Sequence, residues 1–203
     1  VADGIRAAGG VAQAFQCNIT DRAEVDAAVA AAEAALGPVD VLVNNAGITR
    51  DGAFKRMVPD QWFEVIHTNL CSLYNVTQPL FDAMCEQRDA RIINISSVNG
   101  QKGQFGQVNY SAAKAGMLGF TKALAAEGAR FGVTVNAIAP GYTATPMVEA
   151  IRSDILDSIK ADIPMRRLAK PEEIAAAVAF LASEAGAYIT GETLAINGGL
   201  YMK

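Results

Sequence analysis

The chain has 203 residues, of which 51% are hydrophobic and 19% are charged, and its formal net charge is −4. This composition excludes intrinsic disorder, and a chain of this size buries enough surface to fold without disulfides or metals. The longest fully apolar run, Ile174 to Ala182, is too short to span a bilayer. Mild acidity argues against nucleic acid or an anionic membrane as the partner.

Three cysteines (Cys17, Cys71 and Cys85) form no CxxC pair, and the only histidine, His67, has no neighbours at metal-ligand spacing. We therefore expect buried free thiols, a structural histidine and no metal site. The chain starts at Val1 without the pattern of a secretory leader. Reduced thiols and the missing leader pattern both indicate a cytoplasmic protein.

Strand-like and helix-like segments alternate along the chain, which is typical of a mainly parallel sheet. In the first part of the chain we expect a helical end over 1–8, a strand over 11–17, a helix capped by Thr20 or Asp21 and running to 36, and a strand over 39–43. A long helix over 61–86, capped by Asp60, comes next, and a strand over 91–95, a helix over 108–131 and a strand over 133–138 follow it. The chain then has helical pieces within 145–162, a helix over 171–182 and a last strand over 193–196.

This order predicts one Rossmann-like domain over 1–203, with a doubly wound α/β sheet. Ligands of such sheets bind beyond the carboxyl ends of the strands, so the polar loops 44–52, 96–107 and 140–147 are expected to gather there. No GxGxxG-like turn joins a strand to a helix, although such turns hold dinucleotide pyrophosphates. Either the first βαβ piece is missing from this sequence, or the protein functions without it.

The strongest chemical signal is Tyr110 followed by Lys114, early in a predicted helix. Residues four apart share a helix face, so the ammonium can lie near the phenol and lower its pKa. A tyrosine with a lowered pKa can exchange protons near neutral pH.

Two polar residues are expected to join this pair. Ser97 follows a predicted strand, so its hydroxyl can face a substrate carbonyl beside Tyr110, whereas Ser96 points the other way. Asn69 interrupts the long helix, where its amide can order a water near Lys114 and complete a proton path.

The whole chain resembles the short-chain dehydrogenase/reductase family. The motifs that carry this resemblance match the family in order and spacing: Asn44-Asn45-Ala46-Gly47, Asn69, Ser97, Tyr110 with Lys114, and Pro140-Gly141. Members move a hydride between NAD or NADP and a carbonyl or alcohol carbon. The resemblance implies that Tyr110 is the general acid in reduction and that Ser97 holds the carbonyl oxygen. It also implies that Lys114 lowers the tyrosine pKa and binds ribose hydroxyls, and that Asn69 supports a water relay.

The resemblance also implies cofactor contacts in two regions. Small residues after a strand let the main chain approach the adenosine side, and a later loop holds the nicotinamide. The adenosine-side residues are Asn44, Ala46 and Gly47, with Asn18 beside the adenine where the family usually has Asp; the nicotinamide-side residues are Pro140, Gly141, Thr143 and Thr145. The resemblance favours NADPH and leaves NAD(H) open.

Three segments, 47–51, 97–107 and 197–202, resemble acetoacetyl-CoA reductases of polyhydroxyalkanoate synthesis. Amide groups of Gln104 and Gln107 suit the second carbonyl of a 3-oxoacyl thioester. Phe105 and Tyr142 can wall a short acyl chain. Asp51 and Arg56 are expected near the pantetheine and nucleotide of coenzyme A; solvated charges at a helix start are an equally good interpretation of these two.

Two alternatives stay open. Reduction of 3-oxoacyl groups on acyl carrier protein calls for a basic patch, to which Lys55, Arg56 and Lys102 contribute little. A chain without a pyrophosphate site can instead serve as a non-catalytic assembly subunit. In either case the family resemblance implies a homotetramer.

Overall fold

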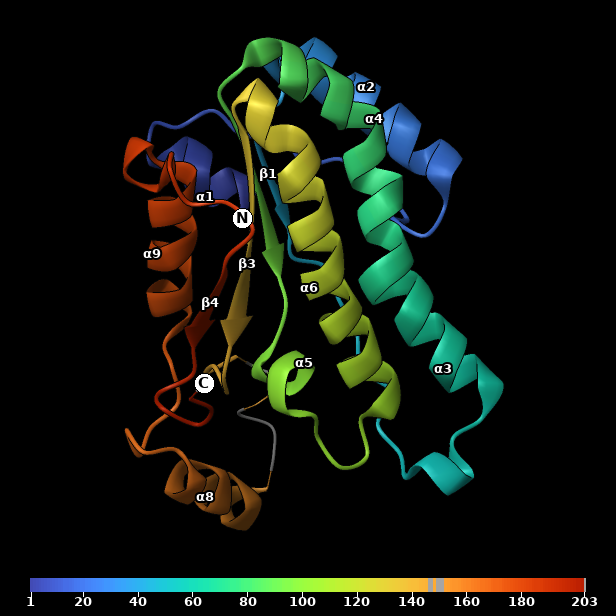
Figure 1. Cartoon of the computed structure of the whole chain (residues 1–203), viewed down its shortest axis with the longest axis vertical. Helices are drawn as coiled ribbons and strands as arrows, with labels where there is room; N and C mark the ends of the chain where they lie inside the picture. The colour runs from blue at the N-terminus through green and yellow to red at the C-terminus, as the bar shows by residue number, and fades with distance from the viewer. Residues whose placement is uncertain (146–147, 149–151, 203) are drawn as a thin grey trace.

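The computed structural model describes residues 1–145, 148 and 152–202, and its centre is a parallel sheet (Figure 1). Its strands are β1 (Val41–Asn44), β2 (Ala90–Ile95), β3 (Val133–Pro140) and β4 (Thr193–Ile196). They pair in the order β1-β2-β3-β4, all parallel. The strand ends therefore meet at one edge, as predicted, and α5 and α8 lie at that edge (Figure 1).

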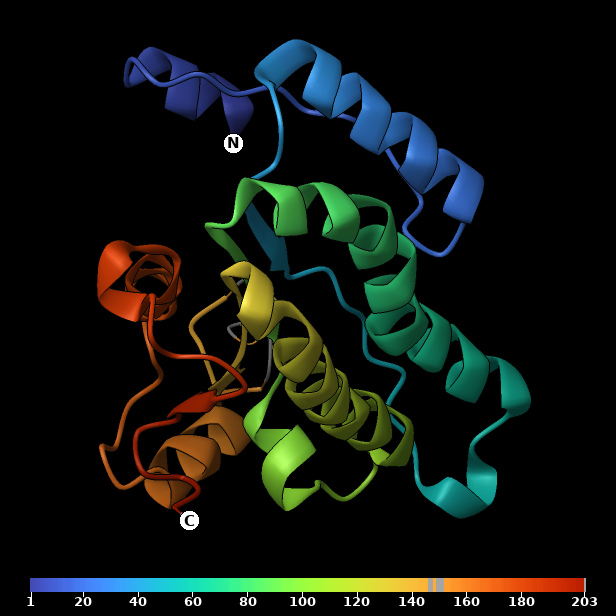
Figure 2. The ribbon, with the colours of Figure 1, turned by 45° about the horizontal axis from the view of Figure 1, so that its top comes forward.

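Helices cover both faces of the sheet, so the predicted α/β class is confirmed. The helices are α1 (Ala2–Ala7), α2 (Arg22–Leu36), α3 (Pro59–Ile66), α4 (Ser72–Gln87), α5 (Val98–Lys102), α6 (Val108–Gly128), α8 (Ser153–Asp162) and α9 (Pro171–Ala182). Helices α4 and α6 pack on one face and α9 on the other, with α2 outside α4 (Figures 1 and 2).

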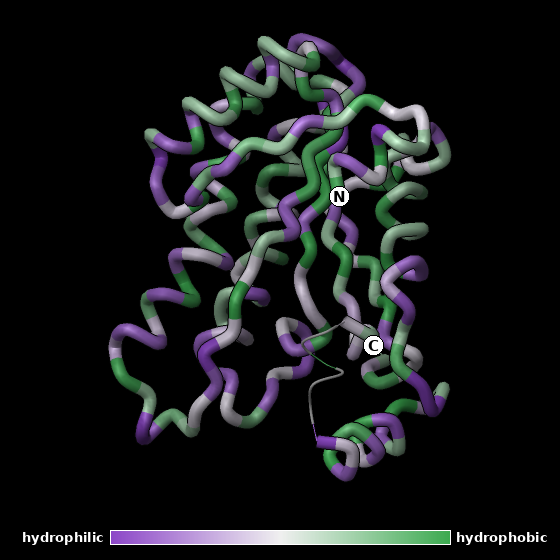
Figure 3. The backbone as a smooth tube through the Cα atoms, turned by 180° about the vertical axis from the view of Figure 1, so that it is seen from behind, coloured by the Kyte–Doolittle hydropathy of each residue, from purple (hydrophilic) through white to green (hydrophobic). Residues whose placement is uncertain are grey.

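The core is split between these two faces. Successive strand residues point to opposite sides, so Ile92 packs with α4 and α6 while Ile93 packs with Leu181 of α9. Burial on both faces explains why the central strands are apolar runs rather than alternating patterns, and Figure 3 shows these hydrophobic strands inside more polar helices. Among the described helices, none is both long and apolar enough to cross a membrane.

One predicted strand is wrong. Residues 11–17 lie between α1 and α2 without strand structure, and Val11 is 85% exposed. Within the described ranges β1 is hydrogen-bonded only to β2, so residues 11–17 do not join the sheet along the free edge of β1.

Details of caps and thiols also differ from expectation. Asp21 caps α2 as predicted, since its Oδ1 accepts the N–H groups of Ala23 and Glu24. Asp60 does not cap α3; the cap bond runs from the Val58 N–H to Oε1 of Gln61. Cys71 is exposed rather than buried.

The long predicted helix is interrupted where Asn69 lies. Helices α3 and α4 are joined through a π-helical turn, His67–Cys71. Such a turn inserts one extra residue into the helix and often marks a functional site. Asn69 is 1% exposed within it.

Candidate active site

Ser97 and Tyr110 meet at the carboxyl edge of the sheet. Ser97 follows β2 and caps α5, its Oγ accepting the Asn99 N–H at 3.1 Å. Tyr110 is the third residue of α6, and the Ser97 side chain lies close enough to its phenol to lower the pKa of that group. Because Ser97 Oγ accepts from the main chain, its own hydrogen remains available for donation. Ser96 points elsewhere, as expected, and donates to the main-chain oxygen of Lys114.

Lys114 lies one helical turn beyond Tyr110 and is 3% exposed. Its Nζ donates to the main-chain oxygen of Ile95 at 2.6 Å and lies 5.7 Å from the centroid of the Tyr110 ring. The ammonium of Lys114 therefore lies near the phenol ring of Tyr110, as predicted. Burial lowers the pKa of Lys114 to about 8, because the low-dielectric interior disfavours the ammonium.

The expected fall in the tyrosine pKa is corrected by the structure. Burial raises the pKa of Tyr110 above its ordinary value, the nearby Ser97 side chain offsets part of this rise, and the charge of Asp51 adds to it. Desolvation of the phenolate outweighs the favourable groups around it. In this chain alone, Tyr110 is held in its protonated form, which is the form that can donate a proton.

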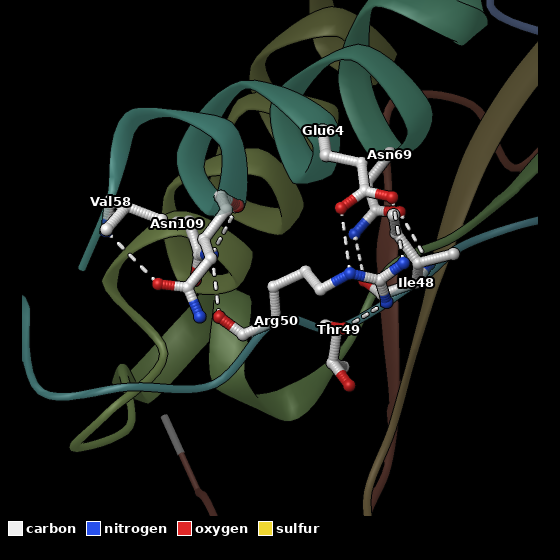
Figure 4. Close-up of polar contacts among 8 residues, drawn as sticks. Ile48, Thr49, Arg50, Val58, Glu64, Asn69 and Asn109 are labelled. Carbon is white, nitrogen blue, oxygen red and sulfur yellow. Dashed lines mark hydrogen bonds and ion pairs between the residues drawn. The ribbon is translucent and has the colours of Figure 1, made fainter.

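Asn69 binds the loop after β1 rather than standing free in the site. Its Oδ1 accepts the Ile48 N–H and its Nδ2 donates to the Ile48 oxygen, both at 2.8 Å (Figure 4). A Cβ on Gly47 would lie 3.2 Å from Asn69 Oδ1 and 3.5 Å from Lys114 Nζ. Gly47 therefore brings the main chain close to both residues; the water relay itself stays a prediction.

Asn109 is a site residue that the sequence reasoning missed. It is fully buried, and its Nδ2 donates to the main-chain oxygens of Arg50 (3.0 Å) and Gln61 (2.9 Å). Its Oδ1 accepts the N–H of Tyr110 at 2.8 Å. One amide thus joins the loop after β1, helix α3 and the start of α6 (Figure 4). Its place directly before Tyr110 was the available signal.

Two cavities adjoin at Ser97 and Tyr110, which line both. The larger, of about 480 Å³, extends toward α5 and α8, and the smaller, of about 220 Å³, extends toward β1 and Lys114. Thr49 and Gly141 also border both. The serine and tyrosine hydroxyls therefore stand where two bound molecules could meet.

Most residues predicted to bind substrate line the larger cavity. These are Asp51, Gln104, Phe105, Gln107 and Tyr142. Phe105 is 90% exposed and so forms a rim rather than a buried wall. Arg56 is exposed and lines neither cavity, because its 3₁₀ turn, Phe54–Arg56, points it to solvent.

The amides beside the site are already engaged. Gln104 Oε1 accepts from Lys102 Nζ at 2.9 Å. Gln107 Nε2 donates to Asp51 Oδ2, and its Oε1 accepts from Asn99 Nδ2, both at 2.9 Å. Asp51 is therefore hydrogen-bonded to Gln107 at the cavity and is not only a solvated charge at a helix start.

The predicted cofactor contacts divide into three groups. Gly47, Pro140, Gly141 and Lys114 line the smaller cavity. Thr143 and Thr145 line the larger one instead, because the chain turns away after Gly141 and Thr143 bridges to Ala169.

Three further predicted contacts border neither cavity: Asn18, Asn44 and Ala46. Asn44 points into the fold, where its Nδ2 donates to Asn94 Oδ1 at 2.9 Å and to Thr77 Oγ1 at 3.2 Å. Asn18 accepts from Thr20 in a local turn before α2. Their side chains have structural roles that the sequence pattern did not distinguish from cofactor binding.

The smaller cavity suits the ribose and nicotinamide end of a dinucleotide. Gly47 and Gly141 keep two of its walls free of side chains, while Lys114 and Tyr110 supply an ammonium and a hydroxyl that can hold sugar hydroxyls. Among the residues that the model describes, no cluster of His, Cys, Asp and Glu could hold a metal ion.

Comparison with known proteins agrees with this geometry. A family model described as Enoyl-(Acyl carrier protein) reductase matches residues 2–201. The chain belongs to the short-chain dehydrogenase/reductase family. It is an oxidoreductase by this membership, and the family implies NAD or NADP as its cofactor.

Curated relatives specify the likeness further. The chain is 65% identical over 187 residues to an acetoacetyl-CoA reductase of Acinetobacter, covering 91% of this chain and 75% of that protein. It is 54% identical to the acetoacetyl-CoA reductase of Cupriavidus necator, over 93% of this chain and 77% of that one. A 3-oxoacyl-[acyl-carrier-protein] reductase of Salmonella typhimurium is 50% identical over 91% of this chain and 76% of its own length.

Proposed function

We propose that the chain catalyses NADPH-dependent reduction of acetoacetyl-CoA to 3-hydroxybutyryl-CoA. The observation that carries this proposal is the position of Ser97 and Tyr110 between two cavities, in a chain 65% identical to an acetoacetyl-CoA reductase. Residues 1–203 act as one Rossmann-like domain, in a homotetramer of the cytoplasm.

In the proposed mechanism, a nicotinamide held in the smaller cavity would supply the hydride that reduces C3. Tyr110 and Ser97 hold the 3-oxo oxygen from the side of the larger cavity, and Tyr110 gives its phenolic proton to that oxygen as charge develops. Two preorganised donors at the developing alkoxide supply the main electrostatic stabilisation. The raised pKa of Tyr110 keeps the donor protonated in the chain alone.

Lys114 and Asn69 support this reaction. The Lys114 ammonium, bound to the Ile95 oxygen, borders the smaller cavity, where it would hold the ribose hydroxyls of a bound cofactor. Its positive charge also stabilises the phenolate that Tyr110 becomes when it gives up its proton. Asn69 fixes Ile48 and so the wall of the same cavity, beside the proposed water path.

The larger cavity suits a polar, short acyl thioester. Tyr142 and Gln107 line it, so it offers an aromatic wall for the acyl chain and an amide for the second carbonyl. Thr143 and Thr145 add hydroxyl groups on the same side. The chemistry of the lining supports a 3-oxoacyl group more than a simple apolar ketone.

The second candidate is a 3-oxoacyl group carried on acyl carrier protein, which the 50% identical Salmonella relative favours. Carrier protein is acidic, and the three cations expected to form a basic patch, Lys55, Arg56 and Lys102, are exposed but line neither cavity. Arg50 does not add a further free cation, because its guanidinium forms an ion pair with Glu64 through two hydrogen bonds. Because these few cations make only a small basic patch, the charge of the surface favours a coenzyme A thioester over the acidic carrier protein as the substrate.

The deciding experiment compares kcat/KM for acetoacetyl-CoA and acetoacetyl-carrier protein, with NADPH and with NADH. The proposal predicts preference for the coenzyme A thioester and for NADPH. A clear preference for the carrier protein would replace it by the second candidate. Failure of the folded protein to bind either nicotinamide cofactor would instead favour the non-catalytic subunit.

A further inference from the structure

A series of hydrogen bonds crosses the wall of the larger cavity, in which Asn99 donates toward Ser97 at one end and toward Gln107 and Asp51 at the other. The Asn99 N–H donates to Ser97 Oγ at 3.1 Å, and Asn99 Nδ2 donates to Gln107 Oε1 at 2.9 Å. Gln107 Nε2 then donates to Asp51 Oδ2 at 2.9 Å. All four residues line the cavity, so the series links the catalytic serine to its far wall. We call it the Ser97–Asp51 series.

The direction of this series follows from the chemistry of its end. A carboxylate only accepts hydrogen bonds, so Gln107 must turn its NH₂ toward Asp51 and its oxygen toward Asn99. Asn99 must then present its own NH₂ to Gln107. Its remaining oxygen, Oδ1, is buried without a partner among the described residues, and Asn99 as a whole is 8% exposed. Leaving a buried acceptor unpaired is unfavourable, which indicates that the orientation itself has a use.

The consequence concerns the second hydrogen of Gln107. Its Nε2 carries two hydrogens, and the bond to Asp51 uses one. Gln107 borders the cavity that Ser97 and Tyr110 share, so the second hydrogen is available to a molecule bound there. Were the amide reversed, an oxygen would take its place and would repel a carbonyl.

We infer that Asn99 is a positioning residue, which holds the Gln107 amide so that its free N–H binds the thioester carbonyl of a 3-oxoacyl substrate. This inference rests on the proposed function. Ser97 and Tyr110 hold the 3-oxo oxygen while Gln107 holds the second one. Asn99 contacts no reacting atom itself, and it acts through Gln107 and through its main-chain bond to Ser97.

The test includes a double variant that reverses the amide of Gln107 within the Ser97–Asp51 series and keeps the net charge of the series. Asn99→Asp places acceptor-only groups on both sides of Gln107, whose single NH₂ cannot serve both. The double variant Asn99→Asp/Asp51→Asn restores a complete series in the opposite direction, with the Gln107 amide turned around. Asp51→Asn alone and Asn99→Ala, which removes the side-chain bond without adding charge, complete the set. Gln13→Glu is the control, because it adds the same charge at an exposed position outside the cavity.

Each variant of the full protein is assayed with acetoacetyl-CoA and NADPH, and its Tm is measured. Asn99→Asp is expected to raise KM about tenfold, and Asn99→Ala roughly threefold, with smaller changes in kcat, the range expected for one lost or misdirected hydrogen bond. The double variant is expected to recover the Tm of the wild type but not its KM. Gln13→Glu is expected to leave KM unchanged.

Three results would overturn the inference. One is recovery of both Tm and KM in the double variant, which would make the series a scaffold only. The others are a KM within twofold of wild type in Asn99→Asp or in Asn99→Ala, the latter deciding the case if the charged variant does not fold. Wild-type protein that does not reduce acetoacetyl-CoA would instead overturn the proposed function, so the two failures are distinguishable.

Discussion

The Lys114 ammonium lies 5.7 Å from the centroid of the Tyr110 ring and is held there by the main-chain oxygen of Ile95. Both groups are largely buried, and burial affects their pKa values in opposite directions. It lowers the pKa of Lys114 to about 8 and raises that of Tyr110. The fold therefore keeps the Tyr110 phenol protonated beside the Lys114 ammonium, and burying that charge destabilises the folded state.

The first prediction concerns stability and pH. Lys114 has a folded pKa of about 8, below its unfolded value of about 10.5, so the unfolded state binds more protons between these values. The cost of burying the ammonium is complete below pH 8 and is relieved as pH rises toward 10.5. Lys114→Met should therefore be more stable than wild type at pH 7, by about 2 kcal/mol once the lost bond to Ile95 is subtracted.

Thermal unfolding of both proteins from pH 6 to 10 checks this prediction. The difference in Tm should narrow steadily above pH 8. A difference that stays constant across this range would show that Lys114 is not a destabilising buried cation.

The second prediction concerns Asn109. Asn109→Asp keeps the oxygen that accepts from Tyr110 but loses both donated bonds, to Arg50 and Gln61. Each buried bond lost costs about 1–3 kcal/mol, so we expect a loss of at least 2 kcal/mol in the free energy of unfolding, with a lower kcat. Urea denaturation and steady-state kinetics measure the two effects.

Arg50→Ala is the matched control for Asn109. It removes the exposed ion pair with Glu64 on the same loop (Figure 4). Exposed pairs contribute about 0–1 kcal/mol, so this variant should remain near wild type in stability and kcat. Equal losses in the two variants would refute the special role of Asn109.

The third prediction concerns Gly47, where a methyl group would stand 3.2 Å from Asn69 Oδ1 and 3.5 Å from Lys114 Nζ. Gly47→Ala should shift both groups and lower kcat roughly tenfold, in keeping with the sensitivity of catalysis to small displacements. Gly52→Ala is the control on the same loop, since nothing lies within 4 Å of its added Cβ. If both variants retain full activity, the close approach at Gly47 has no catalytic importance.

The sequence predicts those parts of the fold and site that depend on local spacing. Tyr110 and Lys114 are one helical turn apart, and parallel strands must end at one edge, so their meeting with Ser97 follows from the pattern. The strand expected over 11–17 fails because a strand needs a partner, which its own alternation cannot reveal.

Long-range polar contacts were equally hidden. Asn109 contacts the oxygen of Arg50 from 59 positions away and that of Gln61 from 48. Asn44 matches a cofactor motif, yet its amide turns inward to Asn94, 50 positions on. Only the folded backbone shows which carbonyls are left for an asparagine to satisfy.

The fourth prediction concerns Ser97. Ser97→Ala removes one of two donors at the developing alkoxide, which typically lowers kcat by about 10²–10³. It also leaves the Asn99 N–H without the oxygen that caps α5, so a small fall in Tm should accompany the loss. Single-turnover reduction of acetoacetyl-CoA separates the chemical step from binding. An unchanged rate of that step would exclude Ser97 from holding the carbonyl.

The most direct measurement compares NADPH oxidation by wild type and by Tyr110→Phe, with acetoacetyl-CoA as the oxidant and circular dichroism as the check on folding. We predict that the variant folds and binds NADPH but has no measurable turnover, because it lacks only the hydroxyl that donates the proton. Turnover near the wild-type rate in the folded variant would contradict the assignment of Tyr110 as the general acid.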